Sequence, residues 1–122
     1  MKVYQEKDYK TISHWCALRD MEPPPEWSLP ELGVMVENIA VGFLILTNNN
    51  CAFLDFYISN PMSDKTMRSR ALDQITEALI DTAKDLRVKL VMCNTASFPV
   101  KERARRHDFE SVGEMTHFRK VL

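Results

Sequence analysis

Two apolar runs in the middle of the chain define its core. Residues 39–47 and 52–59 are rich in β-branched and aromatic side chains, and three asparagines separate them. Such runs around turn-forming residues predict a β-hairpin. Their apolar positions are nearly continuous, which indicates strands that are covered on both faces. Gly42 inside the first run calls for a bulge or a close backbone approach.

The next segment has the periodicity of one long amphipathic helix. Apolar residues, Ile75 and Leu79 among them, recur at three- and four-residue spacing through residues 66–86, which indicates one buried helix face. Ser63 is a suitable N-terminal cap. The short apolar run at residues 90–93 then predicts a buried strand, reached by a crossover and parallel to the second strand of the hairpin.

Shorter elements are expected on either side of this core. Asp8 can cap one helix, and Pro99 fits the first turn of another. Four prolines exclude regular helix from the connection at residues 21–30, although a short helix at residues 28–32 is compatible with Pro30 in its first turn. Trp27 in this connection either lines a pocket or pins the loop onto the core. A closing hairpin around Gly113 is predicted at the C-terminal end. The expected strands are residues 2–5, 32–36, 109–112 and 115–121, and the expected helices are residues 9–19 and 99–107.

The composition is that of one ordinary globular domain. A chain of 122 residues with 45% hydrophobic side chains can form a core without disulfides or metals. The net charge of -1 provides no overall field that would recruit nucleic acid or a membrane. No apolar run is long enough to span a bilayer, and polar residues follow Met1 too soon for a signal peptide. We therefore expect a cytoplasmic protein.

The three cysteines predict no metal site and no disulfide. Cys16, Cys51 and Cys93 are odd in number and lie in apolar surroundings. None of them forms a pair with the spacing that metal ligands require. Free thiols in a reducing compartment are the expectation.

Four short motifs follow one another along the chain. They are Ala-Val-Gly at 40–42, Tyr-Ile-Ser-Asn-Pro at 57–61, the segment 83–91 with the pattern A-x-x-x-G-hydrophobic-x-x-L in part, and Asp-Phe-x-x-x-Gly at 108–113. Together with the order of elements they resemble the GNAT (Gcn5-related N-acetyltransferase) superfamily over almost the whole chain, and in particular short, divergent members that bacteriophages encode, which implies a bacterial or phage-infected cell. The resemblance implies an α/β (α+β) fold, with a mixed, mainly antiparallel sheet and helices on both faces.

The resemblance implies acetyl-CoA as the cofactor, held in a split between the fourth and fifth strands. The family's pyrophosphate loop, R/Q-x-x-G-x-G/A, would fall at the start of the long helix, where this chain has no glycine. Arg68 and Arg70 could hold the pyrophosphate by their charge, but without glycines the backbone cannot approach it closely. Binding of acetyl-CoA is therefore expected to be weak or absent. The implied cofactor-binding residues are Tyr57, Ile58 and Ser59 on the fourth strand, Arg68, Ser69, Arg70, Ala71 and Leu72 in the loop, and Ser97.

Acetyl transfer to an amine also needs a base and an acid. The family commonly uses a tyrosine on the last helix as the acid, and its place falls near Ala104 here, with no tyrosine after Tyr57. Asp55 is the candidate base, because a carboxylate can take the proton of the amine. It could equally be a structural acid. His107 and His117 are possible proton carriers, although histidine is an ordinary surface residue.

Three functions are therefore weighed. The first is an acyl-CoA-dependent N-acetyltransferase with a degenerate cofactor loop. The second is a non-catalytic protein that keeps this scaffold to bind a protein partner, in a bacteriophage virion for example. The third is a nucleic-acid binder, against which the near-zero net charge and the lack of interleaved aromatic residues argue. The basic residues that it would use are Arg68, Arg70, Lys101, Arg103, Arg105 and Arg106. For the last four, which lie on one predicted helix, a solvated face is the default interpretation.

Overall fold

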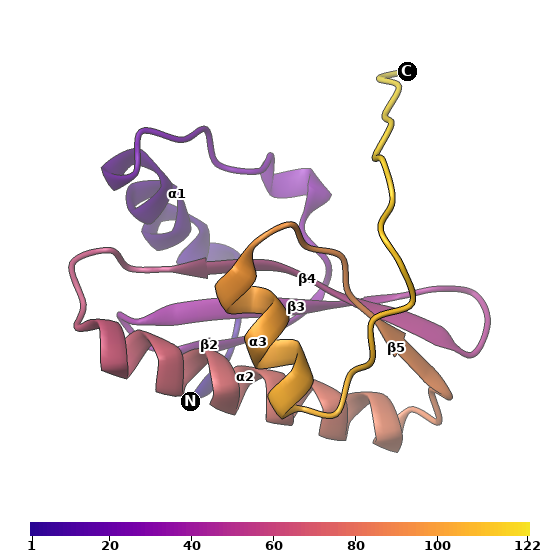
Figure 1. Cartoon of the computed structure of the whole chain (residues 1–122). Coiled ribbons are helices and arrows are strands. Elements are labelled where there is room, and N and C mark those ends of the chain that lie inside the picture. The colour runs from indigo at the N-terminus through magenta and orange to yellow at the C-terminus, as the bar shows by residue number, and fades with distance from the viewer.

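The centre of the molecule is one five-stranded sheet whose strands follow each other in chain order. A computed structural model describes all residues, 1–122, and Figure 1 shows their arrangement. The first four strands are antiparallel neighbours, and the fifth lies parallel to the fourth, as the crossover predicts. The strands are β1 (Lys2–Val3), β2 (Leu32–Val36), β3 (Ala40–Leu46), β4 (Cys51–Ser59) and β5 (Leu90–Met92).

Helices cover both faces of this sheet (Figure 1). They are α1 (Tyr9–Leu18), α2 (Lys65–Asp85) and α3 (Phe98–Arg106), with two single turns, η1 (Glu6–Asp8) and η2 (Glu26–Ser28). Side chains of α1 pack with one face of β2 and β3, whereas those of α2 pack with the other face of β3 and β4. The predicted α+β architecture, with a mixed and mainly antiparallel sheet, is confirmed.

The core is divided by the sheet into two layers. On the α2 face, Ile75 and Leu79 are almost completely buried, as the helical periodicity predicts. On the α1 face, Trp15 and Phe43 are buried in a separate cluster. The two layers explain why the apolar positions of β3 are continuous, because each of its faces meets a helix. The three cysteines are free thiols.

Gly42 lies in close contact with the side chain of Ile75 on α2. A Cβ atom at this position would be 2.7 Å from Ile75 Cγ2 and 2.7 Å from the ring of Tyr57. The β3–β4 register shifts between Val41 and Phe43, and Phe56, on the opposite strand, has φ 54. Both the bulge and the close approach that the sequence calls for are therefore present at this glycine.

Replacing Gly42 by alanine is expected to reduce the free energy of unfolding by about 1–3 kcal/mol, because the added methyl group overpacks this contact. A urea denaturation curve measures the change. Gly113 lacks this crowding, since no heavy atom lies within 4 Å of a Cβ built there. An alanine at 42 that leaves stability unchanged would show that α2 can move away from β3 at no cost.

The predicted closing hairpin is wrong. No strand follows α3, and residues 110–122 are all exposed. An isolated hairpin is at best marginally stable in water, so alternating residues form strands only where a face is available to bury. Trp27 is likewise not pinned onto the core, because 87% of it is exposed.

The caps of α1 and α2 also differ from prediction. The Asp8 carboxylate does not cap α1; it accepts hydrogen bonds from the Gln5 backbone N–H at 2.9 Å and from Lys2 Nζ at 2.8 Å. A short 3₁₀ turn precedes α1 and directs this carboxylate toward β1. The cap of α2 is Asp64 rather than the predicted Ser63.

Candidate functional site

Strand β5 pairs along its whole length, but only with the first three residues of β4. Cys51 pairs with Leu90 and Phe53 with Met92, so residues 54–59 of β4 continue without a β5 partner. Tyr57 on this unpaired part and Cys93, directly after β5, both pack against the core layer on the α2 face. The end of β5 therefore leaves a phenol and a thiol against the inner side of α2.

The Tyr57 hydroxyl is fixed by α2. Thr76 Oγ1 donates to the Leu72 carbonyl at 2.8 Å, so its oxygen accepts from the Tyr57 hydroxyl at 2.9 Å. Burial raises the pKa of Tyr57 to about 12, although the hydrogen bond with Thr76 opposes the change. Burial also raises the pKa of the Cys93 thiol. Both groups are therefore neutral at pH 7 and act here as a hydrogen-bond donor and an apolar thiol.

Three cationic or potentially cationic side chains join α3 to α2 through one carboxylate. Asp73 Oδ1 lies 3.4 Å from Arg103 Nε, 3.1 Å from Arg106 Nη2 and 3.0 Å from His107 Nε2. We call these four residues the Asp73 cluster. Partial burial tends to raise the pKa of Asp73, but the hydrogen bonds from His107 and Arg106 and the charges of the arginines lower it overall. No residue of α3 is buried, so these contacts are a main attachment of α3.

The Asp73 cluster corrects the interpretation of the basic run as a solvated face. The side chains of Arg103 and His107 are only 12% and 11% exposed, whereas Arg105 is exposed and pairs with Glu102 at 2.7 Å. Positions 103, 106 and 107 have the spacing that places residues on one side of a helix. That spacing was the available signal for a shared acceptor, but the sequence does not say which acid lies opposite.

The N-terminus of α2, where the cofactor loop was expected, is occupied by the protein's own carboxylate. Asp64 Oδ2 accepts hydrogen bonds from the backbone N–H groups of Thr66 at 3.0 Å and Met67 at 3.1 Å. A carboxylate there stabilises the helix dipole in the way that a bound phosphate would. A second anion would have to displace it or overcome its charge.

Arg68 is also used within the chain. Its Nη1 donates to the carbonyl oxygens of Pro61 at 3.0 Å and Ser63 at 2.9 Å, which ties the β4–α2 connection to the helix. Arg70 is exposed and Ser69 is partly buried. The positions of the expected loop therefore lie inside α2, after its first turn.

Ala71 and Leu72 belong to the packed side of the helix. Ala71 is 2% exposed, and Leu72 packs against the same core layer. A backbone in regular helix cannot wrap a pyrophosphate with these residues, since their N–H groups already bond within the helix. Their cofactor role stays a prediction.

The remaining predicted residues are spread over different surroundings. Asp55 is exposed, and its Oδ1 accepts from the backbone N–H of Phe56 at 2.7 Å. Ile58 packs on the α1 face, opposite Tyr57. The carbonyl oxygen and the hydroxyl of Ser59 accept from Arg19. Ser97 is exposed at the beginning of α3. The structure therefore gathers Tyr57 with Asp73 and Cys93 rather than with Asp55.

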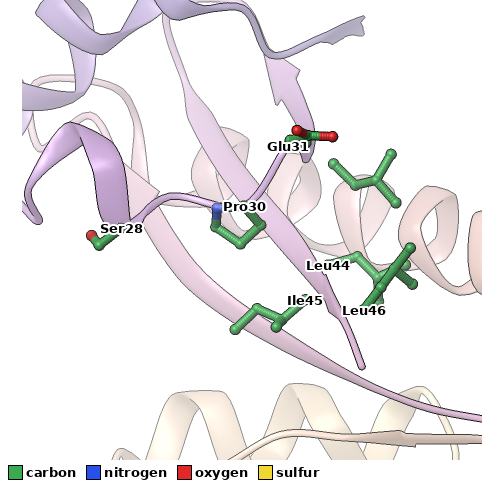
Figure 2. A pocket seen from close by; sticks show the side chains of 7 residues that line it. Ser28, Pro30, Glu31, Leu44, Ile45 and Leu46 are labelled. Atoms are coloured by element: carbon green, nitrogen blue, oxygen red, sulfur yellow. The ribbon is translucent and has the colours of Figure 1, made fainter. Parts of the chain in front are cut away.

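A separate open pocket of about 330 Å³ lies near the end of β3 that meets the start of β4 (Figure 2). The Ser28 hydroxyl already donates to the Pro25 carbonyl at 2.6 Å. None of the predicted site residues borders the pocket, so it contributes no group to the candidate chemistry. Its lining residues are Ser28, Pro30, Glu31, Leu32, Leu44, Ile45 and Leu46.

Comparison with known proteins supports the fold and leaves the function open. A crystal structure of a point mutant of TTHA1254 from Thermus thermophilus is similar, with a TM-score of 0.68, 12% sequence identity, and coverage of 100% of this chain and 98% of that one. No protein-family model and no curated protein matches the chain. At this identity the likeness shows a shared fold.

None of the helices is long and apolar enough to cross a membrane, and no group of three or more metal-ligating side chains is present.

Proposed function

We propose that this chain is a non-catalytic interaction protein that uses a GNAT-like scaffold to bind a protein partner. The observation that carries the proposal is the Asp64 carboxylate on the N-terminal N–H groups of α2. A CoA pyrophosphate would need the same donors, and it would meet a negative charge in their place. Association with a bacteriophage particle stays a prediction from the resemblance.

Two further features favour the same function. The Asp73 cluster fastens α3 to α2 and acts electrostatically on Tyr57, which lies on the part of β4 without a β5 partner. The resemblance puts the cofactor between these two strands. The Tyr57 hydroxyl is bonded to Thr76, and burial raises its pKa to about 12. It is therefore poorly suited to exchange protons with a substrate at neutral pH.

Calorimetric titration with acetyl-CoA is expected to show a dissociation constant weaker than about 1 mM for the natural chain. Asp64→Asn should strengthen binding, because asparagine still caps the helix but carries no charge. Any gained affinity should fall with salt and disappear when Arg68→Ala and Arg70→Ala are added. Asp81→Asn is the matched control, since it removes the same charge from an exposed position far along α2.

Tight, salt-insensitive binding by the natural chain would overturn this proposal in favour of the second candidate, an acyl-CoA-dependent N-acetyltransferase. The parallel pairing of β4 with the short β5 favours that candidate, since residues 54–59 leave strand-edge backbone groups without a β5 partner. Asp55 would then be the base by resemblance. Asp55→Asn should leave acetyl-CoA binding intact and remove turnover, as measured by release of free CoA thiol with an amine acceptor.

A further inference from the structure

The last thirteen residues form an exposed apolar arm. We call residues 110–122 the C-terminal arm; in Figure 1 it is the yellow segment that extends away from the sheet. Phe109, just before it, packs against the core layer on the α2 face and anchors its root. Phe118 is 92% exposed. Large apolar side chains that gather on an exposed segment mark an interaction site; here they are Val112, Met115, Phe118, Val121 and Leu122.

The surface area of the chain is larger than that of a compact monomer. Its accessible surface is 8935 Å² for a mass of 14.2 kDa, whereas a compact monomer of this mass exposes about 6,800 Å². The excess of about 2,100 Å² is similar in size to the total area that a stable protein interface buries, about 1,600 Å². If the arm docks on a second copy of the chain, the excess area is large enough to form the interface of a specific dimer.

The same chain carries a strand edge that can receive the arm. Strand β5 is the last of the sheet and pairs only with β4, so its outer edge presents free backbone donors and acceptors. Leu90 at the start of β5 and Leu86 just before it are each about half exposed. The opposite edge, β1, is shorter still, with two residues against the three of β5. An extended peptide binds such an edge by backbone hydrogen bonds, with pockets for alternate side chains.

From these observations we infer that the C-terminal arm adds as a strand to the outer edge of β5 in a second copy of this chain, and that the exchange is reciprocal. The arm can reach a neighbour, because thirteen extended residues span up to about 45 Å. In its own domain the arm buries none of its residues. One arm docked on one β5 edge in each direction makes a two-fold interface in which the same contacts occur twice. The inference does not depend on whether the chain binds CoA.

Sedimentation velocity of the whole chain tests the inference. At about 100 μM the natural chain is expected to sediment at twice its mass of 14.2 kDa. Phe118→Asp in the arm and Leu90→Asp at the edge should each raise the dissociation constant about tenfold or more. Both positions are exposed, so the variants should fold. Trp27→Ser is the matched control, because Trp27 is equally exposed outside the arm and its loss should leave the dimer unchanged.

Mixing the two variants gives the sharpest result. A pair that consists of one Phe118→Asp chain and one Leu90→Asp chain retains one intact arm-to-edge contact, so the mixture should dimerise more than either variant alone. A monomeric natural chain, a dimer that survives Phe118→Asp, or a dimer weakened equally by Trp27→Ser would each overturn the inference. So would a monomer whose arm amides are protected from hydrogen exchange, because the arm would then lie on its own sheet.

Discussion

Replacing Ile75 by alanine is expected to reduce the free energy of unfolding by about 2–5 kcal/mol. Ile75 is completely buried between α2 and the sheet, and its Cγ2 lies against the backbone at Gly42. The bulged strand and the Tyr57 ring beside it have little freedom to move into the cavity that alanine would leave. The loss of stability should therefore be larger than at a site whose neighbours can close the cavity. A domain of this size has about 5–15 kcal/mol of total stability, which makes the change a large share of it.

Urea denaturation followed by circular dichroism measures this loss. Ile80→Ala is the matched control, because it deletes the same atoms from the next turn of α2 at a partly exposed position, and it should cost less. A loss below about 1 kcal/mol for Ile75→Ala would mean that α2 is not packed on the sheet through this face.

The second large effect is expected from Asp73→Asn. The variant keeps the shape of the side chain but removes the charge that Arg103, Arg106 and His107 share. Hydrogen bonds to charged groups contribute about 1.5–3 kcal/mol, and the partial exposure of Asp73 places the loss toward the lower end. Because no residue of α3 is buried, the amides of α3 should exchange hydrogen faster in the variant.

The pH dependence of this difference has a defined sign. The folded protein lowers the pKa of Asp73, so the carboxylate stabilises the fold above its unfolded pKa of about 3.9. That contribution is lost as the pH falls through the folded pKa. Denaturation curves of the natural chain and the variant should therefore differ at pH 7 and converge in acid. Asp81→Asn should give no such difference, and equal stability of Asp73→Asn and the natural chain at pH 7 would contradict the attachment role.

The parts of the fold that were predicted correctly are those with a local pattern. The apolar spacing along α2 identified Ile75 and Leu79 as core, because side chains three or four residues apart lie on one side of any helix. The asparagines between β3 and β4 indicated the hairpin, and the single long crossover required β5 to lie parallel to β4. In each case a few neighbouring residues contain the information.

The caps and the Asp73 cluster show what a local pattern leaves out. Ser63 and Asp64 are both good caps by type, and only the path of the chain after Pro61 decides that Asp64 faces the free N–H groups. Asp73 and His107 are 34 positions apart in sequence. Their contact depends on how α2 and α3 lie against the sheet, which no spacing within either helix specifies.

The sequence by itself therefore determined the order of the elements and the buried side of α2, since both follow from the periodicity of the backbone. Only the tertiary structure decided whether a polar or extended segment found a partner. It filled the expected anion site with Asp64, turned part of a basic run into an attachment through Asp73, and left the C-terminal arm unpaired with the sheet of its own chain. The physical reason is that ion pairs and strand pairing need a second segment at the right distance, and the sequence pattern of one segment contains no information about that distance.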